Sequence, residues 1–376
     1  MNWRAHTGVA VRELVWHYLQ AIGFFMFVLL VIALTIDLTD NLDGVLKRAD
    51  ELRDPTWLVL LKYLFFRSVD IITRLLSMAA LIGGGVATAL RHHRMEDIVL
   101  DAAGASPSIV LSALCMVGVM MGVVQGSFQN WLRPIVVQQQ VEMNLGKLGG
   151  WFGETELPKH VWVTSNSQTL RAKITRGSQP KISDVTIFNG VDQPSLGSIT
   201  FAQHAVPFGK DGQWRLENAV VWTKEGNIEN KTSKFEFLEV ELPINIERVQ
   251  WYDVHTYYIP NHALRQIAQL PQLEFSYGAM TTLAVRKAAF FLPAVFALFG
   301  TSLAMAGRRG RRLAPFRLLV LATIGYVTVV SVKVLWALGM HGRMEPFLAA
   351  TTSIWLAFGL SVLLQLQQAG YLSRTK

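Results

Sequence analysis

Four ionisable residues lie close together in the sequence, just before and within a hydrophobic stretch: Lys62, Arg67, Asp70 and Arg74. The last three are spaced by three and four residues, so they share one face of a helix. A further cation, Lys333, sits late in another hydrophobic stretch. A charge near the middle of a bilayer costs at least ~2.5–3.5 kcal/mol on insertion scales, so it normally has a partner or lines a cavity. The lysines and arginines either snorkel to the lipid headgroups or form a basic rim that grips an anionic headgroup.

The segment 91–106 shows a second pattern. Its apolar residues recur at helical spacing, at Met95, Ile98, Val99 and Ala102. Glu96 lies off this stripe, and Gly104 can end the helix. The helix either rests on lipid or docks against a cytoplasmic partner. Its acidic residues favour docking, because a helix that lies on anionic lipid is usually basic.

Motifs for catalysis, metal binding or nucleotide binding are absent from the sequence. It contains no G-x-x-x-x-G-K-[ST] loop, no H-E-x-x-H, no C-x-x-C and no G-x-S-x-G. His92 and His93 are adjacent, so they point about 100° apart on a helix and are not placed to share a metal. The single cysteine, Cys115, allows no internal disulfide. We therefore predict no catalytic and no metal-binding residues, and a membrane enzyme that acts on lipid is a minor alternative.

The composition indicates the elements that must position these residues. Of 376 residues, 51% are hydrophobic and 16% are charged, whereas about 25% are charged in ordinary soluble domains. A helix that spans the hydrocarbon needs about 20 apolar residues. Long uncharged stretches occur at Tyr18–Ile36, Leu75–Leu90, Ala102–Leu132, Ala288–Gly307, Leu318–Val332 and Phe347–Leu372. These predict six transmembrane helices. In the third, Gly118, Gly122 and Gly126 have the spacing of close helix packing.

Basic residues predict the orientation, since lysine and arginine accumulate in cytoplasmic loops. The strongest cluster, Arg308, Arg309, Arg311 and Arg312, lies between the fourth and fifth stretches. Arg91 and Arg94 lie between the second and third stretches. Both termini are then inside, and the segment Trp131–Lys287 is outside. The net charge of +8 belongs to this pattern and does not indicate a nucleic-acid partner.

The outer segment reads as a β domain. Short strands are predicted at Val161–Thr164, Thr169–Thr175, Asp184–Phe188, Ser198–Val206, Trp214–Thr223 and Lys234–Leu242. Turn signals such as Asn189-Gly190 separate them, and a short helix near Asn261–Leu270 leads back to the membrane. The fold class is an α-helical membrane protein with an inserted all-β domain that forms an antiparallel sandwich, jelly roll or open barrel.

The order of these segments resembles the LptF/LptG family, the permease subunits of the bacterial lipopolysaccharide exporter. The resemblance covers nearly the whole chain. Local similarity is best at Met95–Gly104, with further similarity at Trp131 and Pro134, Val161–Val163 and Trp214–Leu216. Trp162 and Trp214 lean toward the LptG branch.

Membership implies a set of partners. An LptF-like paralogous permease pairs with this chain, and an LptB-like ATPase dimer in the cytoplasm supplies ATP and magnesium, so this chain has no cofactor of its own. An LptC-like bridge protein with a single membrane anchor receives the lipid in the periplasm. The resemblance implies that the segment 91–106 is the coupling helix, and the residues implied in ATPase coupling are Arg91, Arg94, Met95, Glu96, Val99 and Leu100.

The resemblance also implies a route and three segments of the chain. Lipopolysaccharide leaves the outer leaflet of the bacterial inner membrane between the first and fifth helices and moves onto a periplasmic jelly-roll-like domain. Residues 1–132 hold helices one to three with the coupling helix, residues 133–275 form the β domain, and residues 276–376 hold helices four to six. The predicted headgroup contacts are Lys62, Arg67, Arg74 and Lys333.

One position departs from the family pattern. Family members often have a basic residue at the outer end of the first helix, where this chain has Asp37. We predict that Asp37 pairs with Lys333 as a lateral gate, because their charges are opposite and their depths are similar. The alternative function is a membrane scaffold or mechanotransmitting subunit whose outer domain binds a protein partner without moving lipid.

Overall fold

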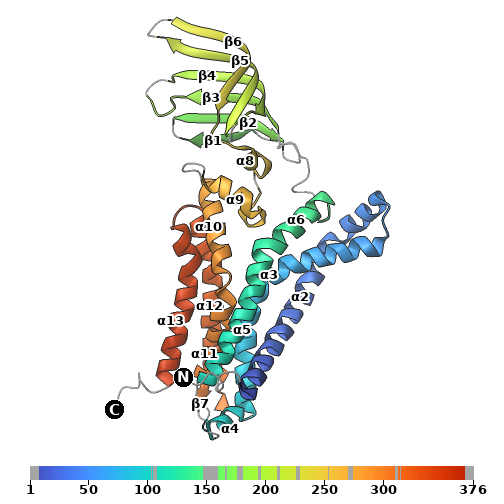
Figure 1. The fold of residues 1–376 in the computed structure, drawn as a ribbon, viewed down its shortest axis with the longest axis vertical. Coiled ribbons are helices and arrows are strands. Elements are labelled where there is room, and N and C mark those ends of the chain that lie inside the picture. The colour runs from blue at the N-terminus through green and yellow to red at the C-terminus, as the bar shows by residue number, and fades with distance from the viewer. Residues whose placement is uncertain are drawn as a thin grey trace. The chain divides into compact units, whose positions relative to one another are not determined.

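The computed structural model consists of helices and one large antiparallel sheet (Figure 1). It describes residues 8–102, 104, 108–146, 160–165, 167–175, 181–193, 196–209, 212–225, 229–252, 254–269, 274–309, 312–313 and 315–368. The chain forms two compact units. The helical unit comprises Met1–Val137 and Ala284–Lys376, and the β unit comprises Gln138–Leu283.

The helices of the helical unit account for the predicted spans. They are α2 (Val9–Leu52), α3 (Thr56–His93), α4 (Glu96–Ala102), α5 (Ser108–Ser127), η1 (Phe128–Leu132), α6 (Arg133–Glu142), α10 (Glu274–Ala288), α11 (Leu292–Ala306), α12 (Pro315–Met340) and α13 (Pro346–Gln368), of which α6 and α10 continue into the β unit. Within the described residues, five helices are long and apolar enough to cross a membrane, or six if one bent pair counts as a single span. With the bent pair counted as one span, the six predicted transmembrane helices are all present. The predicted fold class is confirmed. A two-stranded hairpin of β7 (Arg308–Arg309) and β8 (Arg312–Leu313) precedes α12.

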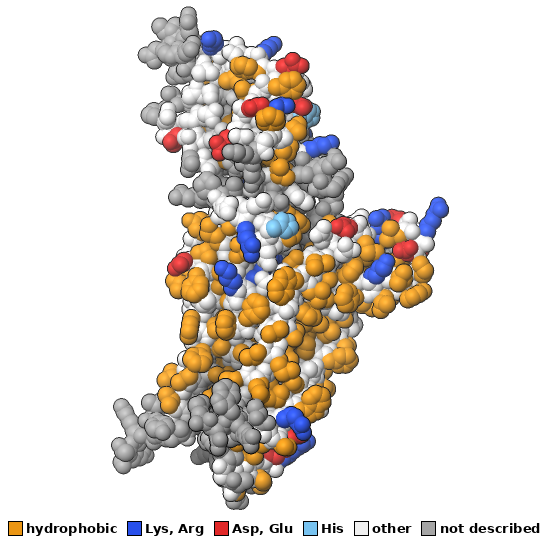
Figure 2. Space-filling view, in the orientation of Figure 1, with side chains coloured by type: hydrophobic (Ala, Val, Ile, Leu, Met, Phe, Trp, Pro, Cys, Tyr) orange, Lys and Arg blue, Asp and Glu red, His pale blue; other side chains and the backbone are white. Residues whose placement is uncertain are grey.

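The surface of the helical unit suits a lipid environment. Figure 2 shows hydrophobic side chains over most of the visible face of the helices. Exposed examples are Phe24, Phe27, Val119, Tyr326 and Trp355. An apolar surface this continuous is not found on soluble monomers, so the helices are membrane-spanning.

Helix α11 occupies the centre of the helical unit and packs against α3, α5, α12 and α13. Glycines make the close approaches. A Cβ added at Gly84 would lie 2.7 Å from the carbonyl oxygen of Ala297, and one added at Gly118 would lie 2.6 Å from the Cβ of Ala294. Gly83 meets α2 in the same way, at 2.6 Å from the Cα of Ile22. The predicted packing role of Gly118 is confirmed, because small residues let helix backbones come together.

The fourth predicted span is broken. Its two halves, Phe275–Ala288 and Leu292–Ala306, meet at 61°. Pro293 lies in the first turn of α11, where it has no N–H to bond the carbonyl of Ala289 and its ring would clash with that carbonyl in a continuous helix. Gly122 of α5 faces the carbonyl of Phe290 in this break.

The β unit contains all six predicted strands. They are β1 (Val161–Ser165), β2 (Gln168–Thr175), β3 (Lys181–Asn189), β4 (Ser198–Pro207), β5 (Gln213–Glu225) and β6 (Glu229–Glu241). They pair in chain order as one antiparallel sheet, so β1 and β6 are its edges. The order of the described strands is up-and-down, which differs from the Greek-key order of a jelly roll. Three short helices follow: α8 (Ile246–Gln250), η2 (Thr256–Tyr258) and α9 (Asn261–Ala268).

One face of the sheet is the core face. It carries alternating buried residues such as Leu170, Ala172 and Ile174, and the chain after β6 packs on it through Ile244 and Val249. The buried Trp214 belongs to this face and donates its indole N–H to the carbonyl of Ile244 at 2.7 Å. The alternation follows from the pleat, because successive side chains of a strand point to opposite faces.

The alternation of inward and outward side chains shifts by one residue in β3, β4 and β5, at one level across the sheet. Inward residues are three apart in β3 (Ile182 and Val185), in β4 (Ala202 and Ala205) and in β5 (Leu216 and Ala219). Ile182 pairs with Ala205, and Val185 pairs with Ala202, so the shift falls at the same level in β3 and β4. Asp184 and Asn218 adopt positive φ at this level, 51° and 53°, which aspartate and asparagine tolerate better than most residues.

Candidate functional site

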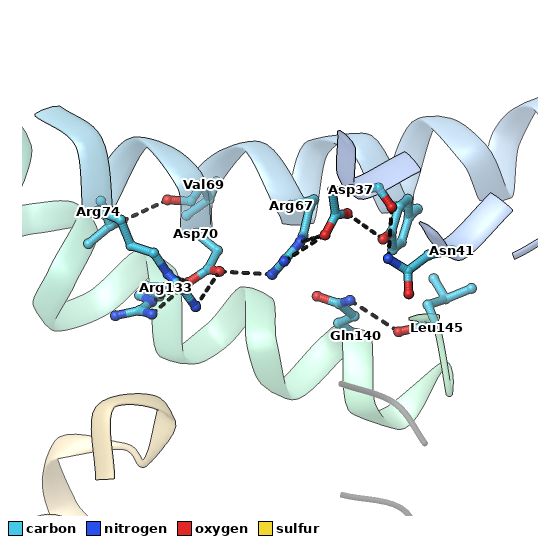
Figure 3. Close-up of polar contacts among 11 residues, drawn as sticks. Asp37, Asn41, Arg67, Val69, Asp70, Arg74, Arg133, Gln140 and Leu145 are labelled. Carbon is cyan, nitrogen blue, oxygen red and sulfur yellow. Dashed lines mark hydrogen bonds and ion pairs between the residues drawn. The ribbon is translucent and has the colours of Figure 1, made fainter. Parts of the chain in front are cut away.

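The carboxylate of Asp70 in α3 is the centre of a polar network in the helical unit (Figure 3). Arg133, the first residue of α6, donates from Nε to Asp70 Oδ1 at 2.7 Å, and its Nη2 lies 2.6 Å from the same oxygen. On α3 itself, Arg67 and Arg74 each place a guanidinium nitrogen 2.9 Å from Asp70 Oδ2. Three arginines therefore bind one carboxylate, which joins α3 to the start of α6.

A second carboxylate, that of Asp37, extends the network to α2 (Figure 3). Arg67 donates from Nε to Asp37 Oδ1 at 2.7 Å. Tyr63 donates its hydroxyl to Asp37 Oδ2 at 2.6 Å. Arg67 therefore bridges Asp37 and Asp70, and the two contacts together join α2, α3 and α6.

The π-helical turn η1 keeps the polar residues of the third predicted span on one line. Gln125, Gln129 and Arg133 are buried and four residues apart. In a regular α-helix, residues four apart drift by about 40° around the axis at each step. A π turn bonds residue i to i+5 and so holds more residues than an α turn, which offsets this drift. Gln125 donates to the carbonyl of Thr73 at 2.8 Å, and Thr73 directly precedes Arg74 of the network on α3.

Burial and charge differ across the network. The side chains of Asp70 and Arg133 are 2% and 1% exposed, whereas that of Arg74 is 43% exposed. Three guanidinium groups, those of Arg67, Arg74 and Arg133, contact the carboxylates of Asp37 and Asp70. Burying a charged group is costly unless it is paired and hydrogen-bonded. These contacts hold three helices together.

The predicted headgroup residues do not form one cluster. Arg67 and Arg74 lie in the network, whereas Lys62 is 4.0 Å from Asp54. Lys333 is exposed on α12 and forms no ion pair with any residue that the structure describes.

The structure pairs Asp37 with Tyr63 and Arg67 rather than with Lys333. Sequence reasoning missed Arg133, which is 63 residues from Asp70. The signal that could have found it is a charged residue just before Pro134, at the end of a hydrophobic span.

The predicted coupling segment begins at the end of α3. Arg91 is a buried residue of α3, Arg94 and Met95 form the turn, and α4 begins at Glu96. Glu96 Oε2 lies 3.5 Å from Nε of Arg91, and its Oε1 lies 3.9 Å from Nη1 of Arg94. Met95 has φ 58°, so the chain reverses there and its N–H bonds the carbonyl of His92 at 3.0 Å. The ion pairs tie the start of α4 to the end of α3.

Two residues of the predicted apolar stripe are open to solvent. Met95 is 50% exposed and Val99 is 66% exposed, while Leu100 of α4 is half-buried. The side chains of Asp97, Ile98 and Asp101 lie outside the described residues, as do Ser106 and Pro107. The structure thus leaves an apolar pair exposed on a short helix that is fixed at its N-terminal end.

Metal chemistry has no visible basis in the described residues. No three histidine, cysteine, aspartate or glutamate side chains in that part of the chain are arranged to hold a metal ion. Both carboxylate oxygens of Asp70 are bound by arginine side chains.

These features define the class of the protein. It is a multi-pass membrane protein with buried ion pairs among its helices and a β unit inserted between the third and fourth spans. Comparison with known families then gives its place: a family model described as lipopolysaccharide export system permease LptF/LptG matches residues 12–367. The chain belongs to this family. Comparison with curated proteins finds no match. Membership makes it a permease subunit of lipopolysaccharide export, in a family whose members are not catalytic chains.

Proposed function

We propose that this chain is the LptG-like permease of an ATP-driven exporter in the bacterial inner membrane. It takes lipopolysaccharide from the outer leaflet and passes it to a periplasmic bridge. An LptF-like permease pairs with it, an LptB-like ATPase dimer binds ATP and magnesium, and an LptC-like protein begins the bridge. The family match supports the permease role, and the geometry of α4 and of the sheet supports the steps on either side of the membrane.

The coupling step is supported by the way in which α4 is exposed and attached to α3. Its exposed Met95 and Val99 offer an apolar contact, and Glu96 is bound by Arg91 and Arg94 of the preceding helix end. A push on α4 is therefore transmitted to α3. Helix α3 also carries Asp70 and the network that joins it to α2 and α6, so one helix connects the proposed ATPase contact with the lipid side.

The sheet supports the lipid route. Phe235 of β6 pairs with Ala219 of β5, and directly opposed residues in an antiparallel pair share a face. Phe235 therefore lies on the core face, yet it is 42% exposed. Leu238 and Val240 of the same strand are partly buried on that face. The core face thus has an open apolar margin along the edge strand β6, where acyl chains can lie. Burying each methylene of a lipid chain is worth about 0.8 kcal/mol.

The headgroup contacts that we propose are the cations whose side chains reach the surface. Arg74 is the exposed arginine of the network, Lys62 is partly exposed, and Lys333 is exposed. Arg67 has both carboxylates as partners, so its part is to position the helices that carry the other cations.

Substitution of Glu96 tests the coupling step. Glu96→Lys places a third cation beside Arg91 and Arg94, so α4 separates from α3. In a complex purified with its ATPase and reconstituted in proteoliposomes, we expect lipopolysaccharide release to fall at least ~tenfold, as for the loss of an interfacial charge contact, while ATP hydrolysis continues. Glu13→Lys, the same charge change at an exposed site on α2, is the matched control.

Two outcomes would contradict this assignment. Full lipopolysaccharide release by Glu96→Lys would show that α4 is not the coupling element. The second outcome concerns the wild-type complex. If it contains the ATPase and hydrolyses ATP but releases no lipid, the scaffold alternative is favoured.

A further inference from the structure

A buried arginine in the β unit has no role in the proposed transport steps. Arg248 lies in the short helix α8, just after the sheet, and only 7% of it is exposed. Its backbone N–H is bonded to Oδ1 of Asn245 at 2.9 Å. The neighbouring Val249 packs into the sheet core, so the fold fixes the position of Arg248.

The guanidinium group of Arg248 is not satisfied within the described part of the chain. Its Nε and Nη1 are buried and have no hydrogen-bond partner there. The guanidinium group lies against the ring of Phe275, whose centroid is 5.7 Å from Cζ. Burial lowers the pKa of Arg248 from its usual value. Burying a charge without a partner costs several kcal/mol, so this arrangement calls for an anion.

A second donor near Arg248 in the sequence is also unmatched. The indole Nε1 of Trp251 is buried and has no partner among the described residues. In the same unit, the buried indole of Trp214 does have one, the carbonyl of Ile244. Trp251 and Phe275 both pack against the apolar cluster that includes Ile259 and Leu264. The two donors therefore occur in an apolar setting where buried polar groups are normally bonded.

The surrounding residues indicate the source of the anion. Tyrosine and tryptophan are frequent where a protein crosses the headgroup level of a membrane, and Trp251, Tyr252, Tyr257 and Tyr258 cluster in the sequence just before α9. Phe275 stands in the first turn of α10, which runs on as the first half of the bent candidate span. The arginine thus contacts the end of a helix that enters the bilayer.

We propose that Arg248, with Trp251, binds the phosphate of an anionic lipid headgroup where α10 enters the membrane. The guanidinium supplies charge and two N–H donors, the indole supplies a third N–H, and Phe275 supports the guanidinium from its face. Arginine binds phosphate in this way because its planar fork matches the oxygen geometry.

Thermal unfolding of the full-length protein in a zwitterionic detergent tests the site. We compare three additions: phosphatidylglycerol, phosphatidylcholine and inorganic phosphate. A ligand that binds the folded state raises the unfolding temperature. We expect phosphatidylglycerol to raise that of wild type by about 3 °C or more and to leave that of Arg248→Met unchanged. Arg265→Met, which removes an exposed arginine of α9, should respond as wild type does.

The outcomes separate the possibilities. If phosphatidylglycerol shifts Arg248→Met as much as wild type, the site is wrong. An equal shift of wild type by millimolar inorganic phosphate would show that a free anion is the ligand and would overturn the lipid assignment. An equal shift by phosphatidylcholine would overturn the preference for anionic lipid.

A milder variant keeps the test valid if Arg248→Met does not fold. Trp251→Phe removes the N–H donor and keeps an aromatic ring. We expect its apparent affinity for phosphatidylglycerol to fall about fivefold, the value of one hydrogen bond. Unchanged affinity in Trp251→Phe, together with unchanged affinity in Arg248→Lys, would contradict the proposed geometry.

Discussion

Two buried arginines, one in each unit, have opposite surroundings. Arg133 of the helical unit contacts the carboxylate of Asp70 through two nitrogens, at 2.6 and 2.7 Å. Arg248 of the β unit has a ring face and no carboxylate within the described part of the chain. The first charge is balanced by the chain itself, and its role is to join helices. The second is balanced from outside, and its role is to bind. The partner of a buried charge, and not its burial alone, therefore indicates its role.

Removal of the Asp70 carboxylate should change stability most, because Arg133 is then buried without that carboxylate partner, as Arg248 is buried without one among the described residues. Asp70→Asn leaves three arginines around a neutral amide, and we expect the free energy of unfolding to fall by about 3–5 kcal/mol. Denaturation of the purified protein in detergent measures it. Asp43→Asn, an exposed position on α2, should change little. A loss as small as that of the control would show that the network does not hold the helices.

The two buried arginines should respond differently when each is replaced by methionine. Arg133→Met should lower the free energy of unfolding by about 1–3 kcal/mol, because Asp70 keeps Arg67 and Arg74. Arg248→Met in lipid-free detergent should not lower it, because an unpaired buried charge is removed. Parallel melting curves of the two variants test this. Destabilisation of equal size in both would mean that Arg248 is a structural residue like Arg133.

The smallest effect is expected for an exposed ion pair in the β unit. The hydrogen bond from His160 holds the pKa of Asp184 below its usual value. The pair therefore stabilises the fold at a pH above the unfolded pKa of Asp184, near 3.8, and this contribution is lost as pH falls through the lower folded value. Because both side chains are partly exposed, solvent screens the pair.

Asp184→Asn isolates the charge, since asparagine also tolerates the positive φ at this position. We expect a change of less than ~1 kcal/mol at neutral pH, seen as a slightly weaker dependence of stability on pH between about 5 and 2. A change as large as that of Asp70→Asn would contradict the view that burial sets the value of an ion pair here.

Much of the fold is predictable from local patterns. Six apolar stretches and six alternating strands appear in the structure because hydrophobic length and period are properties of the sequence itself. The close approaches at Gly118 and Gly122 follow in the same way from the spacing of small residues. The long extensions of α2 and α3 beyond their apolar stretches could not be predicted in this way. Charged residues continue a helix there without continuing a hydrophobic pattern.

The site was predictable only in part. Arg67 and Arg74 could be placed on one helix face, whereas the contact of Arg133 with Asp70 depends on how α6 meets α3. The pairing of Asp37 with Arg67 also depends on the packing of two helices.

The sheet shows a similar limit. Strict alternation would put Phe235 and Phe237 on one face, but Phe237 pairs with Glu217 and Phe235 with Ala219. The one-residue shift of the alternation, at the level of Asn218, puts the two phenylalanines on opposite faces. Asn218 has a positive φ there, and a positive φ cannot be predicted from the pattern of a strand.

We propose that lipid drawn from the bilayer by an ATP-driven complex passes along the core face of the sheet. A photo-crosslinking amino acid at position 235, with position 237 on the opposite face as control, tests it most directly in proteoliposomes that contain the ATPase and lipopolysaccharide. We predict that ATP produces a lipopolysaccharide adduct at position 235 and little at position 237. Equal adducts at both positions, or no ATP-dependent adduct at position 235, would contradict it.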